Sequence, residues 1–384
     1  MKIAYINSIY PFGSTGGIVR GLADFCENDE VKVFYGRGEE GEGKILSSFS
    51  LHLGGAFTRL FGREGLRRKR AAKKLVKKLE EFNPDVIHIH NLHGYYINYE
   101  ILFSYLKRAN KKVVWTLHDE WAFTGHCSYF DGELCKAYSK NCKGCKNKRA
   151  YPKSYFDNCE KNYLRKKKAF LGVKDLTIVT PSVWLKGEVE KSFLSCYKTE
   201  VIPNGVDISV FKKRDSNFRE KYGLENKKII LGVAYVWTER KGLHIFNELA
   251  CDLPENYAIV LVGKAEKVNE RIIRIPKTEN KEELAEIYSA CDIFVNPTLF
   301  ENYPTVNVEA LSCLTPVITF SSGGSGEVIT PFNGKVVARD DYEKLKQAVL
   351  ESNFSDKAAM EKERENYNEK HAYSKYYELY LGRK

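Results

Sequence analysis

Residues 293–313 read IFVNPTLFENYPTVNVEALSC. The apolar run from Ile293 to Val295 predicts a buried strand, and Pro297 ends it with a turn. Pro304 stands where the first position of a helix is expected, since that position needs no N–H donor. Helix-compatible residues follow it. The stretch therefore predicts a strand, a loop and the start of a helix.

Two acids lie in this stretch, Glu301 in the predicted loop and Glu309 just over a turn into the predicted helix. A helix N-terminus presents backbone N–H groups and a positive dipole end to an anion such as a diphosphate. The loop carboxylate could accept hydrogen bonds from sugar hydroxyls, and the helical one could bind a ribose diol. The alternative is a surface turn with two solvated acids, which the spacing alone favours.

Apolar strand-like runs alternate with helical patterns along the chain, which predicts an α/β fold with one parallel sheet in each half. The runs are residues 3–6, 31–35, 86–90, 113–117, 176–180, 229–233, 258–262, 293–295 and 317–320. A turn-rich break at 202–207 predicts an N-terminal domain 1–204, a C-terminal domain 205–365 and a final helix 366–384. Ligands of such sheets bind beyond the carboxyl ends of the strands, so the cleft between the two sheets is the expected site.

With 384 residues, the chain is long enough for two domains, and its contents of 43% hydrophobic and 29% charged residues are ordinary for a soluble globular enzyme. No apolar run approaches the roughly 20 residues of a membrane-spanning helix. Pro11 and Gly13 interrupt the N-terminal apolar run too early for a signal peptide, and it is interpreted as a first core strand. The predicted location is the cytoplasm.

Ten basic residues and one acid lie between Arg59 and Lys78. Ala72, Leu75, Val76 and Leu79 fall at helical spacing, so an amphipathic helix with a basic outer face is expected. A solvated helix face and docking to an anionic membrane are the two interpretations. Nucleic acid is disfavoured because the run lacks interleaved aromatic residues and lies in a domain without a nucleic-acid motif.

Other candidates are weaker when taken singly. Gly16 and Gly17 follow the first strand in a loop where a ligand could approach the backbone, and a plain tight turn is the alternative, which these residues alone favour. His118 ends a strand beside Asp119, a pattern shared by site and structural histidines. Arg240 and Lys241 precede a predicted helix and could place two cations on a diphosphate, or be ordinary surface charge.

Two clusters suggest metal ligands. His88, His90 and His93 lie close together, but no acid or cysteine near them in sequence completes a coordination shell. In the irregular loop 124–150, a structural zinc ion held by four cysteines is one interpretation, and free thiols or a redox pair are the others. These four are Cys127, Cys135, Cys142 and Cys145.

Taken together, the motifs resemble the retaining glycosyltransferases of family 4, over nearly the whole chain. The subgroup most resembled builds bacterial capsule, exopolysaccharide or lipopolysaccharide chains. The resemblance implies the GT-B architecture: two Rossmann-like domains facing each other across a cleft, with the C-terminal helix returning to the first. It rests on Gly16-Gly17, residues 117–121, 124–127, 203–207 and 240–242, the Glu301/Glu309 pair, and Gly323-Gly324 with Glu327.

The resemblance implies roles at the reacting sugar. Gly16 and Gly17 would let the N-terminal domain close over the donor. His118 would contact the transferred sugar, and Glu301 would hold its hydroxyls. Retention without an obvious enzymic nucleophile implies attack from the leaving-group face, with the leaving phosphate helping to deprotonate the acceptor.

It also implies roles at the nucleotide. Arg240 and Lys241 would stabilise charge on the departing nucleoside diphosphate, so no metal is required for catalysis. Glu309 would bind the ribose, and the backbone N–H groups of Thr305 and Val306 would face the diphosphate.

Three positions depart from the family pattern. At residues 313–316, CLTP replaces a common glycine before the Thr-Pro pair, which is interpreted as a packing change. Pro304 stands where many relatives have glycine, which removes one N–H donor to phosphate. Val236 stands where relatives often have an arginine, five residues before Lys241.

The predicted function is transfer of a sugar from a nucleoside diphosphate, uridine-linked by expectation, to a growing bacterial surface saccharide. The expected acceptor is lipid-linked and lies at the inner membrane face. The rivals are a catalytically idle GT-B scaffold that binds nucleotide sugar, and a sugar-nucleotide epimerase.

Overall fold

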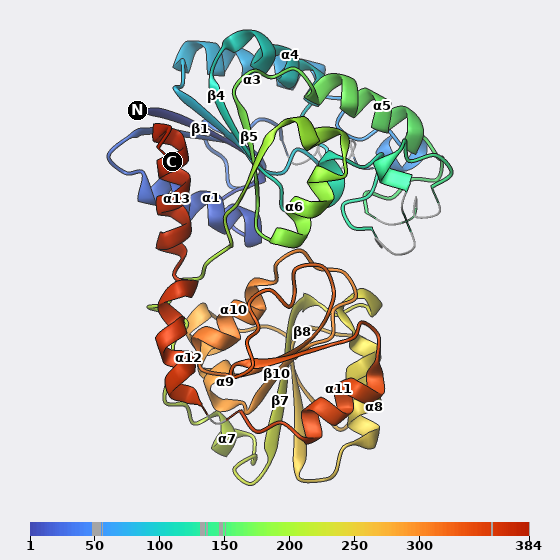
Figure 1. The fold of residues 1–384 in the computed structure, drawn as a ribbon, viewed down its shortest axis with the longest axis vertical. Coiled ribbons are helices and arrows are strands. Elements are labelled where there is room, and N and C mark those ends of the chain that lie inside the picture. Colours follow the sequence, from blue (N-terminus) through green and yellow to red (C-terminus); the bar gives the residue numbers. More distant parts are fainter. Residues whose placement is uncertain are drawn as a thin grey trace. The chain divides into compact units, whose positions relative to one another are not determined.

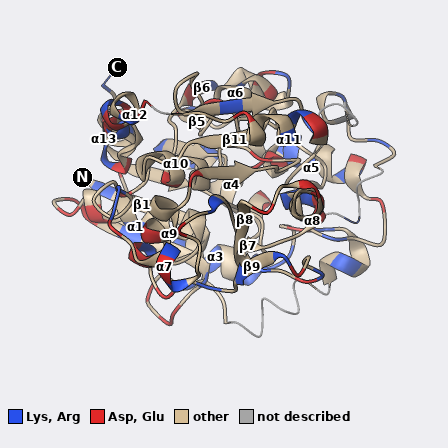
Figure 2. Cartoon of the chain, turned by 90° about the horizontal axis from the view of Figure 1, so that it is seen from below, with Lys and Arg blue, Asp and Glu red and all other residues tan. Residues whose placement is uncertain are grey.

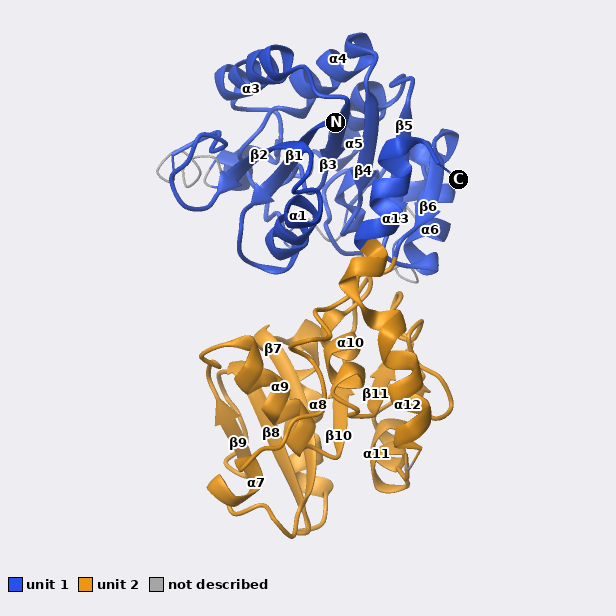
Figure 3. Ribbon diagram, turned by 90° about the vertical axis from the view of Figure 1, so that its left-hand side faces the viewer, with its two compact units in different colours: residues 1–202, 373–384 blue, residues 203–372 orange. Residues whose placement is uncertain are grey.

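Two parallel sheets, each of six strands in the described part of the chain, organise this computed structural model (Figure 1). One compact unit holds Met1–Ile202 and Tyr373–Lys384, and the other holds Pro203–Ala372 (Figure 3). The division follows Ile202, whereas the sequence placed it after residue 204. The structure describes residues 1–47, 55, 57–130, 135, 137–145, 149, 151–354 and 356–383.

The first unit has the strand order β2-β1-β3-β4-β5-β6. Its strands are β1 (Lys2–Ile9), β2 (Glu30–Arg37), β3 (Val86–Ile89), β4 (Lys112–Thr116), β5 (Leu176–Thr180) and β6 (Lys198–Val201). Its longer helices are α1 (Ser14–Phe25), α3 (Lys69–Phe82), α4 (Tyr99–Ala109), α5 (Cys159–Phe170) and α6 (Val183–Glu190). Short 3-10 turns are η1 (Glu120–Ala122), η2 (Ala137–Ser139) and η3 (Phe193–Cys196). The inner strands β3 and β4 are almost entirely buried, as strands covered on both faces by helices must be.

The second unit has the order β12-β11-β10-β7-β8-β9. Its strands are β7 (Lys228–Val236), β8 (Tyr257–Lys264), β9 (Ile272–Ile275), β10 (Ile293–Asn296), β11 (Val317–Phe320) and β12 (Gly334–Val337). Its helices are α7 (Phe218–Lys221), η4 (Glu239–Lys241), α8 (Leu243–Asp252), α9 (Lys281–Ala290), α10 (Thr305–Ser312), α11 (Tyr342–Leu350), α12 (Lys357–Glu363) and η5 (Arg364–Tyr367). The predicted strand, loop and helix of residues 293–313 are thus confirmed as β10, its following loop and α10.

Three strands were not predicted: β6, β9 and β12. Each has four residues and lies at the edge of its sheet. Fewer residues of a short edge strand are buried than of an inner strand. Its sequence therefore contains few of the apolar residues by which a strand is predicted.

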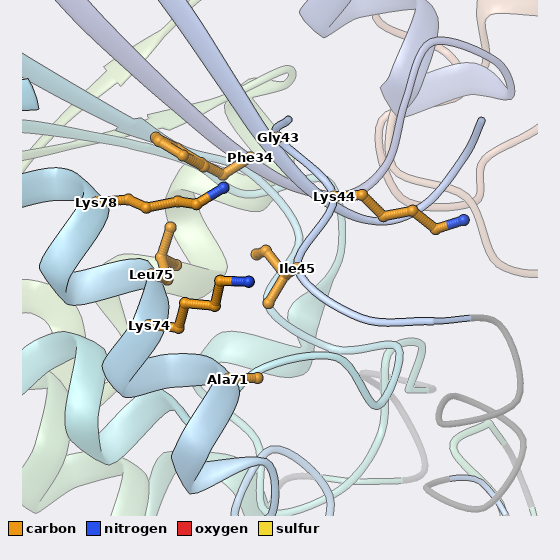
Figure 4. Close-up of a pocket in the computed structure, with 8 residues that line it drawn as sticks. All are labelled: Phe34, Gly43, Lys44, Ile45, Ala71, Lys74, Leu75 and Lys78. Carbon is orange, nitrogen blue, oxygen red and sulfur yellow. The ribbon is translucent and has the colours of Figure 1, made fainter. Parts of the chain in front are cut away.

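Helix α3 confirms the predicted amphipathic helix. Its buried face includes Ala72, Leu75, Val76 and Leu79, while Lys69, Arg70, Lys73, Lys74 and Lys77 are exposed. Figure 2 marks the basic residues of the chain in blue. Figure 4 shows how α3 packs on the segment after β2 around a small hollow, and there the Lys78 Nζ donates to the Glu42 carbonyl at 2.5 Å.

The predicted C-terminal helix is α13 (Glu369–Leu381), and from Tyr373 it belongs to the first unit. The Tyr380 hydroxyl lies 2.6 Å from Nδ1 of His88, and Thr116 Oγ1 donates to the Tyr376 hydroxyl at 3.0 Å. Both tyrosines are 3% exposed, so α13 completes the core of the first unit. In the described residues, no helix has the length and apolar character needed to cross a membrane.

Candidate functional site

The second unit gathers its charged candidates beyond the carboxyl ends of β7 and β10. Strands β8 and β9 lie on one side of β7, whereas β10, β11 and β12 lie on the other, so the direction of winding reverses between β7 and β10. Loops that follow two such strands diverge and leave a crevice that commonly holds ligands. Turn η4 follows β7 and carries Lys241, while Glu301 follows β10.

Lys241 and Glu301 form an ion pair across these loops. The Lys241 Nζ lies 2.5 Å from Oε2 of Glu301, and their side chains are 22% and 15% exposed. Sixty positions separate the two residues in the chain, so only the fold brings them together. Partial burial makes the pair stronger than a surface salt bridge and leaves both groups reachable by a ligand.

Arg240 is fixed to the same loop. Its Nη1 donates to the Phe300 carbonyl at 2.8 Å and lies 3.8 Å from Oε2 of Glu301. Its own carbonyl accepts from the Leu299 N–H at 2.9 Å. The guanidinium therefore helps to hold Glu301 in place, beside its predicted role at a diphosphate.

Glu309 lies on α10 with its carboxylate half-buried. The Tyr288 hydroxyl donates to its Oε2 at 3.1 Å. Burial raises the pKa of Glu309 to about 7, although that hydrogen bond and the charge of Lys281 act to lower it. A carboxyl group with this pKa ionises readily when a ligand supplies hydroxyl donors.

The start of α10 corrects one prediction. Pro304 has extended backbone torsions and is the N-cap residue, so the helix begins at Thr305 and not at the proline. Thr305 and Val306 are the first two helical residues, where N–H groups have no intrahelical acceptor. Their predicted role toward a diphosphate fits this position.

Two buried asparagines that no sequence motif marks hold this site together. Asn296 Nδ2 donates to Oδ1 of Asn307 at 2.8 Å, and Asn307 Nδ2 donates to the Ser325 carbonyl at 3.0 Å. Both asparagines are buried, and the Gly324 N–H donates to the Glu301 carbonyl at 3.3 Å. The segment around residues 323–327 is thereby joined to β10, α10 and the Glu301 loop.

In the first unit the two candidate glycines lie in a helix, not in the predicted loop. Gly13 has φ +74° and turns the chain, and α1 then begins at Ser14. A Cβ at Gly16 would lie 3.2 Å from the Ile9 carbonyl, so glycine lets α1 start against β1. A Cβ at Gly17 would meet no described atom within 4 Å, so this side of the helix start is open.

His118 lies two residues beyond β4 and pairs with His90, which follows β3. The His118 Nε2 is 2.9 Å from Nδ1 of His90. Burial lowers the pKa of His118 to about 4, even though the charge of Asp119 raises it. His118 is therefore neutral at physiological pH and can act as a hydrogen-bonding group, not as a cation.

A buried network supports the segment after His118. Asp119 accepts from the Trp121 N–H at 3.0 Å and lies 2.6 Å from Nε2 of His93. Glu64 Oε2 accepts from the Trp121 indole at 3.1 Å, and the Lys166 ammonium lies 3.6 Å from the centre of a Trp121 ring. Burial lowers the pKa of Lys166 to about 8, against the charge of Glu64. Neither Glu64 nor Lys166 carries a motif by which the sequence could have marked it.

The cysteines of the 124–150 loop lie near one another, and Cys159 of α5 joins them. Hydrogen bonding with Cys145 is the main cause that raises the thiol pKa of Cys127 and of Cys159, with burial second. Sγ of Cys142 accepts from the Gly125 N–H at 3.1 Å. Within the described ranges, no group of three or more His, Cys, Asp or Glu side chains is arranged to hold a metal ion. The zinc site stays a prediction, and residues 131–134, 136, 146–148 and 150 of this loop lie outside the described residues.

The sequence is similar to those of several known glycosyltransferases, among them two from Escherichia coli. The chain is 26% identical over 277 residues to the putative colanic acid biosynthesis glycosyl transferase WcaC of Escherichia coli (strain K12), covering 69% of this chain and 66% of WcaC. It is 26% identical over 182 residues to the Escherichia coli UDP-Gal:alpha-D-GlcNAc-diphosphoundecaprenol alpha-1,3-galactosyltransferase, covering 42% of this chain and 47% of that enzyme. The chain thus matches less than two thirds of the length of these relatives.

Solved structures share the fold over the full length. Anabaena Alr3699/HepE in complex with UDP gives a TM-score of 0.69 at 14% identity, covering 100% of each chain. Such a likeness shows the two-domain GT-B fold. The family description "Glycosyl transferases group 1" matches residues 214–371, and "Glycosyltransferase Family 4" matches residues 15–210. The chain therefore belongs to glycosyltransferase family 4 and has the GT-B fold.

Proposed function

We propose that this chain transfers a sugar from a uridine diphosphate sugar to a growing bacterial surface saccharide, with retention at the anomeric carbon. The Lys241–Glu301 ion pair at the winding reversal of the second sheet carries the proposal. Support comes from relatives: Anabaena HepE has been solved with UDP and with UDP-glucose, and the related galactosyltransferase is named for UDP-Gal and a diphosphoundecaprenol acceptor.

The ion pair prepares both partners for a donor. Glu301 holds the Lys241 ammonium in place until a diphosphate oxygen takes its Nζ–H bonds. The freed carboxylate oxygen then accepts hydrogen bonds from the hydroxyls of the sugar. The Lys241 charge opposes the negative charge that grows on the departing diphosphate, a contribution that is greater in the transition state than in the ground state.

The proposed chemistry balances without a protein nucleophile. The bond between C1 and the phosphate oxygen breaks, and the acceptor oxygen bonds to C1 from the same face. The acceptor hydroxyl gives its proton to the leaving phosphate oxygen. Neutral His118 contributes hydrogen bonding to the sugar and receives no proton in this scheme.

Incubation of the full chain with four uridine diphosphate sugars, those of glucose, galactose and their N-acetylamino derivatives, tests the proposal. Each is supplied with diphosphoundecaprenol-linked saccharide acceptors, and released UDP and the anomeric configuration of the product are measured. We expect acceptor-dependent release with an α-linked product, and Glu301→Ala serves as the background. Binding without turnover would instead indicate a scaffold, and donor conversion without acceptor would indicate an epimerase.

We also propose that the segment from Arg59 to Lys78 docks on an anionic membrane. Besides the basic face of α3, the chain exposes Leu60 (52%), Phe61 (48%), Tyr155 (70%) and Phe156 (62%). The Tyr155 N–H donates to the Arg59 carbonyl at 2.9 Å, and Asn158 Nδ2 donates to the Phe61 carbonyl at 2.7 Å, so these two segments are adjacent. Exposed apolar side chains beside cations are the combination that a bilayer interface binds.

Replacement of Lys69, Arg70 and Lys73 by glutamine is expected to weaken vesicle binding on the order of 100-fold, because each cation near such a surface contributes about 1 kcal/mol. The measurement is co-sedimentation with phosphatidylserine vesicles at low salt. Glutamine at the exposed Lys221, Lys335 and Lys362 of the second unit is the charge-matched control. Equal affinity of the two triple variants would refute docking through α3.

The cysteine loop gives a separate proposal, a structural zinc ion. It rests on the Cys142-x-x-Cys145 spacing, and the predicted ligands are Cys127, Cys135, Cys142 and Cys145. We expect about one zinc per chain by elemental analysis, lost in a Cys142→Ser/Cys145→Ser variant and kept in Cys251→Ser. A zinc-free protein whose melting temperature ignores a chelator would exclude it.

A further inference from the structure

His90 and His118 meet edge to edge. Their ring planes differ by 11° and their ring centres lie 5.2 Å apart. Nδ1 of His90 and Nε2 of His118 are 2.9 Å apart. Because each nitrogen lies only a little over an ångström from its own ring centre, a 5.2 Å separation of the centres requires both nitrogens to lie close to the line that joins the centres. The rings therefore share an in-plane hydrogen bond and are not stacked face to face.

The backbone of His90 is held from two sides. Its N–H donates to the Ile6 carbonyl at 2.8 Å, and its carbonyl accepts from the Trp115 indole at 3.1 Å. The side chain is 1% exposed and packs against His88, with ring centres 4.2 Å apart. The imidazole thus has little freedom to turn away from His118.

The position of the proton follows from the other nitrogen of His90. Both rings are neutral, because burial lowers the pKa of His90 well below its usual value and that of His118 to about 4. A neutral imidazole has one N–H and one acceptor nitrogen. His90 Nε2 is buried and has no hydrogen-bond partner among the described residues.

Two arrangements of protons satisfy the 2.9 Å contact. If His118 donated from Nε2, His90 would carry its own proton on Nε2, and that N–H would be buried and unpaired. If His90 donates from Nδ1, its Nε2 is only an unpaired acceptor. Buried unpaired N–H groups are the rarer case in folded proteins, so the second arrangement is favoured.

We propose that His90 is a positioning residue: it donates its Nδ1–H to Nε2 of His118 and so fixes the tautomer of His118 that carries its proton on Nδ1. Any contact made through Nδ1 of His118 is then one in which His118 donates. His118 accordingly suits an oxygen acceptor, such as a sugar hydroxyl or ring oxygen. This consequence for catalysis rests on the proposed function, whereas the tautomer itself does not.

The tautomer is measurable in the full chain labelled with ¹⁵N histidine. Long-range ¹H–¹⁵N spectra distinguish a protonated ring nitrogen from a bare one, and comparison with a His118→Gln sample assigns the signals. We expect Nδ1 of His118 to be protonated and Nε2 bare. A wild-type spectrum with the proton on Nε2 of His118 overturns the proposal.

Substitutions test whether His90 is responsible. His90→Leu removes the donor, so we expect mixed tautomers of His118, a higher pKa for it, and a kcat lower by roughly 10- to 100-fold, the scale for partners that orient a functional imidazole. His90→Asn places an amide N–H near the original Nδ1 and is expected to keep the tautomer and most of the rate. Tyr376→Phe removes a buried hydrogen bond to Thr116 in the core of the same unit. This control should change neither the tautomer of His118 nor kcat.

Two results would contradict the role of His90: an unchanged His118 spectrum in His90→Leu, or equal kcat in His90→Leu and His90→Asn. If His90→Leu fails to fold, the wild-type tautomer and the His90→Asn variant still decide the question. The predicted tautomer in a protein that transfers no sugar would support the hydrogen bond and refute the proposed function.

Discussion

Replacement of Lys241 by methionine is expected to lower kcat by about 10²- to 10³-fold, the usual effect of removing one preorganised donor at a developing charge. Methionine keeps most of the length and apolar stem of lysine, so packing around η4 changes little. The Glu301 carboxylate loses its 2.5 Å partner and retains the Arg240 guanidinium at 3.8 Å and the Asn302 N–H at 3.4 Å. Steady-state release of UDP with saturating acceptor measures the effect.

Matched variants distinguish the effect of losing the Lys241 charge from the effect of breaking an ion pair anywhere in this unit. Lys346 in the same unit lies 3.0 Å from Asp252, and Lys346→Met should break that pair with kcat unchanged. Lys241→Arg keeps the charge and should retain more activity than Lys241→Met. A Lys241→Met enzyme within threefold of wild type would show that Lys241 does not oppose the leaving-group charge.

Donor binding is expected to weaken by up to about tenfold as the pH falls below the pKa of Glu309, and to be constant above it. Protonation turns one acceptor oxygen of the carboxyl group into a donor, so tight binding of the ribose hydroxyls requires loss of a proton whose pKa in the free enzyme is about 7. Affinity therefore rises from pH 5.5 to 7 and levels off. UDP-glucose is the suitable ligand for calorimetry because it lacks the terminal phosphate group of UDP, which titrates in the same range.

Glu309→Gln should remove this pH dependence and weaken binding about tenfold at pH 8, because hydrogen bonds to a charged acceptor are the stronger ones. Tyr288→Phe removes the hydrogen bond that lowers the pKa of Glu309, so its binding curve should shift to higher pH. A Glu309→Gln curve with the same pH dependence as wild type would assign the titration to another group.

The inner strands could be predicted from sequence because burial on both faces demands continuous apolar runs, as in β3, β4 and β10. The short edge strands could not. Two of the four residues of strand β12, which has the sequence GKVV, are exposed. Its sequence therefore lacks the continuous apolar run that predicts a strand. The helix boundary at α1 was also misplaced, since the glycines suggested a loop where a helix already begins at Ser14.

The candidate site was predictable only as separate residues. Lys241 and Glu301 were each named from a motif, but their contact depends on which strands are neighbours, and no local pattern encodes the β7–β10 pairing. In the sequence, His90 is marked only as one of three candidate metal ligands. Its contact with His118 depends on the pairing of β3 with β4, across 28 positions of the chain.

The crossing of α13 into the first unit sets an order for synthesis on the ribosome. The His88 side chain is buried in that unit. Its hydrogen bond to Tyr380 can form only after the entire second unit has been translated. Until then, Nδ1 of His88 lacks its hydrogen-bond partner in the interior of the nascent first unit. A fragment that stops at Ile202 would lack Tyr380 permanently, so expression of the first unit without Tyr373–Lys384 is expected to give a less stable product.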